Sequence, residues 1–130
     1  MDKRSHKDRH EAGLKTRREV LGAEYVDKAQ AAADDFNRPF TELLNTYCWN
    51  DVWNRPGLPR KARSMLNLAM LSALGRTHEL KLHINGALNN GLSKEEIREV
   101  FLQVAAVYCG VPAAVESFRS AKEVFKERGV

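Results

Sequence analysis

Apolar residues recur at helical spacing through most of this chain, and polar residues fill the positions between them. In the first part, Asp8 and Glu11 have the spacing of a capping box and predict a short helix that ends at Gly22. The apolar positions of residues 25–36 predict a second helix. Pro39 suits the first turn of a third helix, which precedes the centre of the chain.

A loop follows at residues 54–59, where two prolines and a glycine interrupt any regular pattern. The next segment, 60–74, is so rich in apolar residues that we expect a central helix buried on most sides. Ser93 and Glu96 form a second predicted capping box. The helices expected after the loop cover residues 60–74, 77–90, 93–108 and, opening at Pro112, the last stretch of the chain.

No segment alternates with the period of two that a half-buried strand requires, so the predicted class is all-α. The pattern indicates a single helical domain of about seven helices over residues 13–130. Residues 1–12 are charged throughout and are expected to form a frayed leader. A chain of 130 residues is long enough for one core and too short for two independent ones.

Composition excludes several classes of protein. No apolar run approaches the roughly 18 residues that a membrane-spanning helix needs, and the charged first residues lack a secretory signal, so we expect a cytoplasmic protein. The net charge is +4, but basic residues are interleaved with acids along the chain, which disfavours nucleic-acid binding. Cys48 and Cys109 are expected to be reduced and buried.

Candidate chemistry is concentrated in one predicted helix. Arg76, Glu79 and His83 are spaced at i, i+3 and i+7 and therefore share a helix face. An imidazole can donate a proton near neutral pH, and a carboxylate one turn earlier can hold it in its charged form. The alternative is a buried structural histidine beside a surface glutamate. Glycine-rich phosphate loops, Cys-x-x-Cys pairs and metal-ligand spacings are absent from the sequence, so we expect neither a metal nor a cofactor.

Other candidates lie around the proline-rich loop. Arg55, Arg60 and Arg63 either clamp a carboxylate or solvate the start of a helix. Trp49 and Trp53 either pack in the core or form a wall of a binding site. The sequence leaves both pairs of alternatives open.

An ordered set of motifs resembles the γ-carboxymuconolactone decarboxylase family. The motifs are Trp49-Asn-Asp-Val-Trp53-Asn-Arg-Pro-Gly-Leu-Pro-Arg60, Glu79-Leu-Lys-Leu-His83, Asn89-Asn-Gly and Tyr108-Cys-Gly-Val-Pro-Ala-Ala. The likeness extends from about Gly13 to Phe125. It implies the alkyl hydroperoxidase D-like fold and self-association into a trimer or hexamer. Peroxidases of that superfamily carry a Cys-x-x-Cys pair, which this chain lacks, since Arg76 and Glu79 stand at the matching positions.

The resemblance also implies a reaction. It is the conversion of a small anionic lactone, γ-carboxymuconolactone, into β-ketoadipate enol-lactone and carbon dioxide in protocatechuate breakdown, without a cofactor. In this interpretation His83 delivers a proton, Glu79 orients it, and either Arg76 or an arginine of the loop neutralises the substrate. The residues expected to bind the substrate are Arg55, Arg60, Arg63, Trp49, Trp53 and Tyr108. The competing hypotheses are a peroxidase or disulfide reductase of the same superfamily and a non-enzymatic helical binding module.

Overall fold

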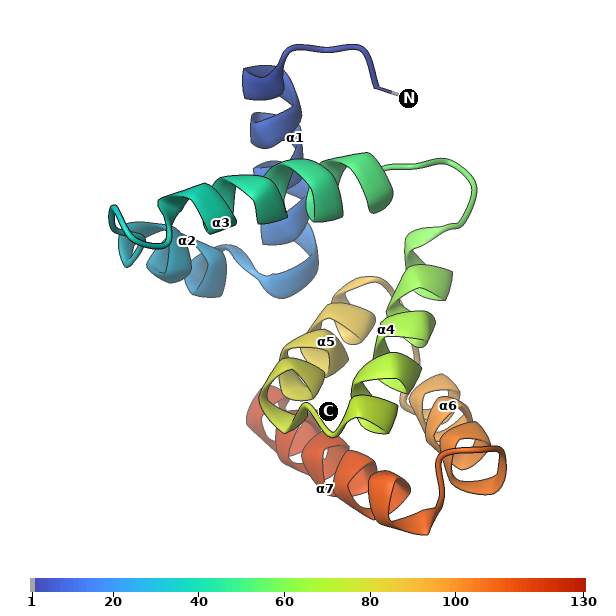
Figure 1. Ribbon diagram of the computed structural model, residues 1–130. Helices are drawn as coiled ribbons and strands as arrows, with labels where there is room; N and C mark the ends of the chain where they lie inside the picture. Colours follow the sequence, from blue (N-terminus) through green and yellow to red (C-terminus); the bar gives the residue numbers. More distant parts are fainter. Residues whose placement is uncertain (1) are drawn as a thin grey trace. The chain divides into compact units, whose positions relative to one another are not determined.

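A computed structural model describes residues 2–130, which form seven α-helices and one π-helical segment with no β-strand among them (Figure 1). The all-α prediction is confirmed. The chain divides into two compact units, the first ending at Pro59 and the second running from Arg60 to Val130. The expectation of a single domain over residues 13–130 stays a prediction. The predicted loop at residues 54–59 is present and precedes this boundary, because its prolines cannot continue a helix.

The first unit is built from α1, α2, α3 and a π-helix, η1, that continues α3 without a break (Figure 1). Their bounds are His6–Leu21, Ala23–Ala31, Arg38–Leu43 and Leu44–Val52. Pro39 lies in the first turn of α3, as predicted. The helix formed by α3 and η1 packs against α1, and a small core forms from Val20, Trp49 and Trp53.

Two predicted boundaries in this unit are wrong. The cap of α1 is Ser5, whose hydroxyl accepts a hydrogen bond from the amide of Asp8, so the helix begins inside the expected charged leader. The second helix ends at Ala31 rather than at Phe36. The carboxylate of Asp34 accepts hydrogen bonds from the backbone amides of Phe36 and Asn37, and this local pairing favours a turn over further helix.

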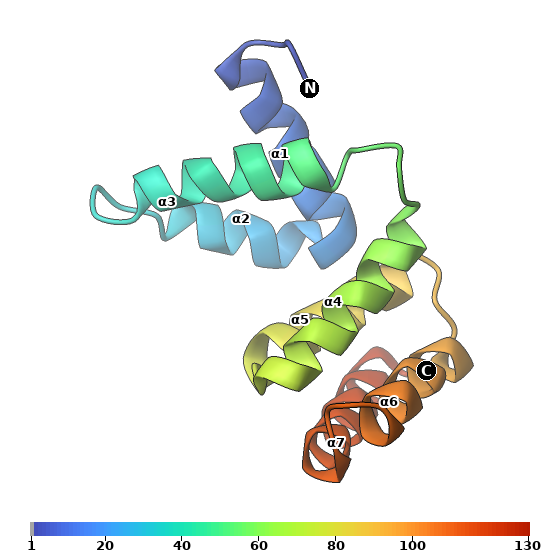
Figure 2. The ribbon, with the colours of Figure 1, turned by 45° about the vertical axis from the view of Figure 1, so that its right-hand side comes forward.

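The second unit consists of four helices, in which α4 packs against α5 and α6 packs against α7 (Figures 1 and 2). Their bounds are Arg60–Leu74, Thr77–Asn89, Lys94–Ala106 and Val111–Arg128. The capping box of Ser93 and Glu96 is confirmed. The core of this unit contains Leu68, Leu80, Ile84, Ala87, Leu92, Ile97, Phe101, Ala121 and Val124.

The expected burial of α4 on most sides is wrong, although its bounds are as predicted. One stripe with a spacing of four residues is buried, namely Ser64, Leu68 and Ser72. A second stripe with the same spacing, Leu66, Met70 and Leu74, is exposed. The helix therefore presents an apolar face that the core of the second unit does not cover.

Candidate active site

His83 lies in the middle of α5, where the helix packs against α4. Its Nδ1 is 3.3 Å from the side-chain amide nitrogen of Asn67 on α4. The ring is largely buried, and this burial lowers the pKa of His83 from 6.5 to about 4, because a charged imidazolium loses its hydration there. The imidazole is therefore neutral at neutral pH.

The contact with Asn67 also determines which ring nitrogen carries the proton. An amide nitrogen can only donate, so the Nδ1 of His83 accepts and the proton is on Nε2. Asn67 was not among the sequence-predicted site residues. The available signal was one amide side chain inside the apolar run from Met65 to Leu71.

Arg76 and Glu79 lie near the start of the same helix but do not surround the imidazole. Arg76 is the N-cap of α5 and is exposed, and Glu79 is an exposed residue of the first turn. Thr77 is the first helical residue of α5, as the predicted range of residues 77–90 has it. The expectation that Glu79 holds His83 in its charged form is wrong for the free protein, since burial shifts the pKa of His83 the other way.

Arg60 and Arg63 precede Asn67 on α4 by seven and four residues, so all three share one face of that helix. Both arginines are half-buried. Arg55 is an exposed residue in the loop of the first unit. Lys81 of α5 forms an ion pair with Glu123 of α7, which raises the pKa of Lys81 through a hydrogen bond to the carboxylate.

The aromatic candidates have different surroundings. Trp49 and Trp53 stack with their ring centroids 5.0 Å apart and lie in the core of the first unit. Tyr108 follows the end of α6 and is fully exposed, with a left-handed φ of 71°. The helix predicted to continue through Tyr108 ends at Ala106.

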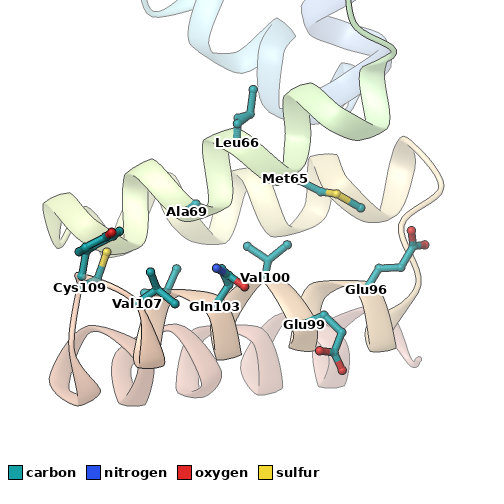
Figure 3. Close-up of a pocket in the computed structure, with 11 residues that line it drawn as sticks. Met65, Leu66, Ala69, Glu96, Glu99, Val100, Gln103, Val107 and Cys109 are labelled. Atoms are coloured by element: carbon teal, nitrogen blue, oxygen red, sulfur yellow. The ribbon is translucent and has the colours of Figure 1, made fainter.

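A groove of about 600 Å³ lies along the facing sides of α4 and α6 (Figure 3). Apolar side chains, including Met65, Val100 and Val107, line most of it. His83 and the arginines are not among its lining residues. An apolar groove of this kind suits a hydrophobic partner better than a small dicarboxylate.

Cys48 and Cys109 are both free and exposed, so their expected burial is wrong. They lie in different units. Within residues 2–130, no group of three or more histidine, cysteine, aspartate or glutamate side chains is placed to hold a metal ion. No helix in that same range has the length and apolar character needed to cross a membrane.

These features can be compared with known proteins. The sequence profile described as the Carboxymuconolactone decarboxylase family matches residues 38–123. This span includes α3 to α6 and most of α7, and with it Asn67, His83 and the α4 arginines. The chain belongs to this family, whose fold is of the alkyl hydroperoxidase D-like type.

Two relatives match most of the chain. It is 41% identical over 122 residues to a 4-carboxymuconolactone decarboxylase from Acinetobacter baylyi, a match that covers 94% of this chain and 90% of the relative. It is 46% identical over 112 residues to a nitrosuccinic acid decarboxylase from Metarhizium robertsii, covering 86% of this chain and 78% of the relative. Both relatives are named as decarboxylases of small acids.

Proposed function

We propose that this protein is a 4-carboxymuconolactone decarboxylase that converts γ-carboxymuconolactone into β-ketoadipate enol-lactone and carbon dioxide. The observation that carries the proposal is the 41% identity, over nearly the whole of both chains, to an enzyme of that name. A peroxidase reaction would need a pair of neighbouring thiols. The sequence has two cysteines, and they are 61 positions apart at Cys48 and Cys109.

The substrate itself can accept the electrons that decarboxylation releases. Its leaving carboxylate is bonded to a ring carbon that is conjugated through a double bond to the lactone carbonyl. When the carbon–carbon bond to the carboxylate breaks, the electron pair moves to the carbonyl oxygen and gives a stabilised ring anion. This anion takes one proton at the carbon next to the carbonyl. The protein therefore has to supply positive or hydrogen-bonding groups and one proton.

Residues of the second unit have the chemistry for these tasks. In our proposal the Nε2–H of His83 supplies the proton to the ring carbon, which leaves the ring of His83 as an imidazolate. The imidazolate then takes a proton back from water and releases hydroxide. Arg60 and Arg63, on the same face of α4 as Asn67, bind the carboxylates, because a guanidinium fork matches a carboxylate geometrically. Arg76, at the start of α5, adds positive charge.

The test uses purified protein and enzymatically prepared γ-carboxymuconolactone. Release of carbon dioxide should occur together with the appearance of the enol-lactone, at a rate far above that of the uncatalysed reaction. Absence of both products with folded protein would contradict the proposal.

A second candidate substrate is nitrosuccinate, favoured by the 46% identity to a nitrosuccinic acid decarboxylase. The chemistry is parallel, because the nitro group accepts the electron pair when the adjacent carboxylate leaves, and the resulting nitronate is protonated at carbon. A parallel assay with nitrosuccinate distinguishes the candidates. If kcat/KM is higher for nitrosuccinate than for the lactone, the second assignment replaces the first.

We also propose that the protein self-associates into a trimer or hexamer and that it acts in the cytoplasm, without nucleic-acid or membrane partners. The exposed apolar stripe of α4 and the apolar groove beside it support self-association. The two exposed free thiols are in keeping with a reducing compartment.

A further inference from the structure

Asn67 and His83 form a polar contact between two helices whose interface is otherwise mainly apolar. The amide nitrogen of Asn67, on α4, lies 3.3 Å from the Nδ1 of His83, on α5. Leu68, next to Asn67, and Ile84, next to His83, are fully buried in the core of the second unit. The contact therefore joins two side chains whose backbones are fixed by packing.

A second hydrogen bond connects the same part of the unit. The side-chain amide of Asn90, which follows α5, donates to the buried hydroxyl of Ser64 on α4 at 2.9 Å. Ser64 precedes Asn67 by three residues and lies on a neighbouring position of the same helix. Two separate amide contacts thus limit sliding of α5 along α4, which keeps the imidazole at a constant distance from Asn67.

The direction of the hydrogen bond has a chemical consequence. Asn67 donates to Nδ1, so it favours the tautomer with the proton on Nε2 and stabilises electron density on the ring. Both effects make Nε2–H a better donor. A carboxylate at the same place would accept from Nδ1–H, leaving Nε2 as a lone pair and making the ring a base.

We propose that Asn67 is a positioning residue that holds His83 as an Nε2–H proton donor in the decarboxylation. This inference rests on the proposed function, since it assigns the donor its orientation within that reaction. It transfers the orienting role that the sequence suggested for Glu79 to an amide on a different helix. The matched test is Asn67→Asp, which keeps the size of the side chain and reverses the direction of the hydrogen bond to a neutral ring. A carboxylate also raises the pKa of a neighbouring imidazole, so the two proteins are compared at about pH 9, where the ring is neutral in both.

The experiment has a spectroscopic and a kinetic part. Nitrogen-15 NMR of the protein, with assigned His83 ring nitrogens, reports which nitrogen is protonated at about pH 9. Steady-state kinetics at the same pH with γ-carboxymuconolactone and nitrosuccinate gives kcat and KM separately. Asn85→Asp is the control, because Asn85 is on the same helix as His83 but its amide donates to the backbone carbonyl of Lys81.

We expect a protonated Nε2 in the wild type and in Asn85→Asp, and a protonated Nδ1 in Asn67→Asp. The kcat of Asn67→Asp should fall by at least about tenfold with little change in KM, because the ring then presents a lone pair instead of a donor. A wild-type ring protonated at Nδ1 overturns the inference even if the variant fails to fold. Unchanged kcat in folded Asn67→Asp also overturns it. Wild-type protein inactive on both substrates refutes the proposed function instead.

Discussion

At the scale of single residues, burial of the His83 imidazole makes the stability of the fold depend on pH. Burial lowers the pKa of His83 from 6.5 to about 4, so the unfolded chain binds more protons than the folded one between these values. The contribution of His83 to stability is therefore complete above pH 6.5 and is lost as the pH falls toward 4. The shift of about 2.5 pH units corresponds to about 3 kcal/mol.

We expect His83→Gln to lose much less unfolding free energy than the wild type does when the pH is lowered from 7 to 4. Glutamine carries no titratable proton, so the loss of about 3 kcal/mol of unfolding free energy that comes from His83 should be absent. Urea unfolding of both proteins at several pH values measures the difference. If the unfolding free energy falls equally with pH in the two proteins, the pKa of His83 is not lowered in the folded state.

The same substitution tests the chemistry at neutral pH. His83→Gln should lower kcat by ~10²–10⁴-fold while KM changes little, because glutamine can hydrogen-bond to the substrate but cannot transfer a proton to carbon. His78→Gln is the control, since His78 is an exposed residue of the same helix. A His83→Gln enzyme nearly as fast as the wild type would mean that the proton comes from water or another residue.

The sequence made His83 a candidate site residue but did not predict its surroundings. Helical spacing places Arg76, Glu79 and His83 on one side of a helix, and that placement led to the expectation of a charged imidazole. The actual partner, Asn67, is 16 positions away on another helix. Spacing along one helix cannot reveal which side chain of a neighbouring helix reaches the ring, nor how deeply the ring is buried.

At the scale of elements, some helix bounds followed from local signals, while the capping-box spacing of Asp8 and Glu11 misplaced the start of α1, whose cap is Ser5. The bounds of α4 at Arg60–Leu74 and the start of α6 after Ser93 are correctly predicted examples. The π-helix η1 was not predictable in this way. Its packing against α1 is closest at Gly13, which is a contact between distant parts of the chain that local signals do not reveal.

Gly13 provides a direct test of that approach. A β-carbon at this position would lie 1.7 Å from the backbone oxygen of Asn45, so the two helices would have to separate. We expect Gly13→Ala to lower the unfolding free energy by about 3 kcal/mol or more, although alanine in an ordinary helix position stabilises by about 1 kcal/mol.

The control is Gly57→Ala, because the space around a β-carbon at Gly57 is open. Urea unfolding of the wild type and the two variants measures the effect. A Gly13→Ala protein as stable as the wild type would show that α1 and η1 are not in close contact at this point.

At the scale of the whole molecule, the proposed reaction places the electron sink in the substrate. Activity should therefore survive exhaustive chelation followed by dialysis, with kcat unchanged within the error of the assay. The measurement compares treated and untreated protein on γ-carboxymuconolactone. Activity that disappears and returns only when a metal or organic cofactor is added would contradict this mechanism.

Self-association is the second property of the whole molecule. Leu66 and Met70 are 51% and 53% exposed on the apolar stripe of α4, and such a stripe is costly to leave in water. We expect light scattering to give a trimer or hexamer at micromolar concentration. The double substitution Leu66→Lys and Met70→Lys should shift the protein toward monomer, because an interface there would bury two unpaired charges.

Val130→Lys serves as the matched control, since Val130 is also exposed, at 56%, but lies at the end of the chain outside the stripe. It should leave the assembly unchanged. The double variant must first be shown to keep its helical circular dichroism, so that dissociation is not confused with unfolding. A wild-type protein that is monomeric at micromolar concentration would contradict the predicted self-association. A folded double variant with the assembly of the wild type would place the interface on another surface, because lysines at two buried contact positions cost several kcal/mol per subunit.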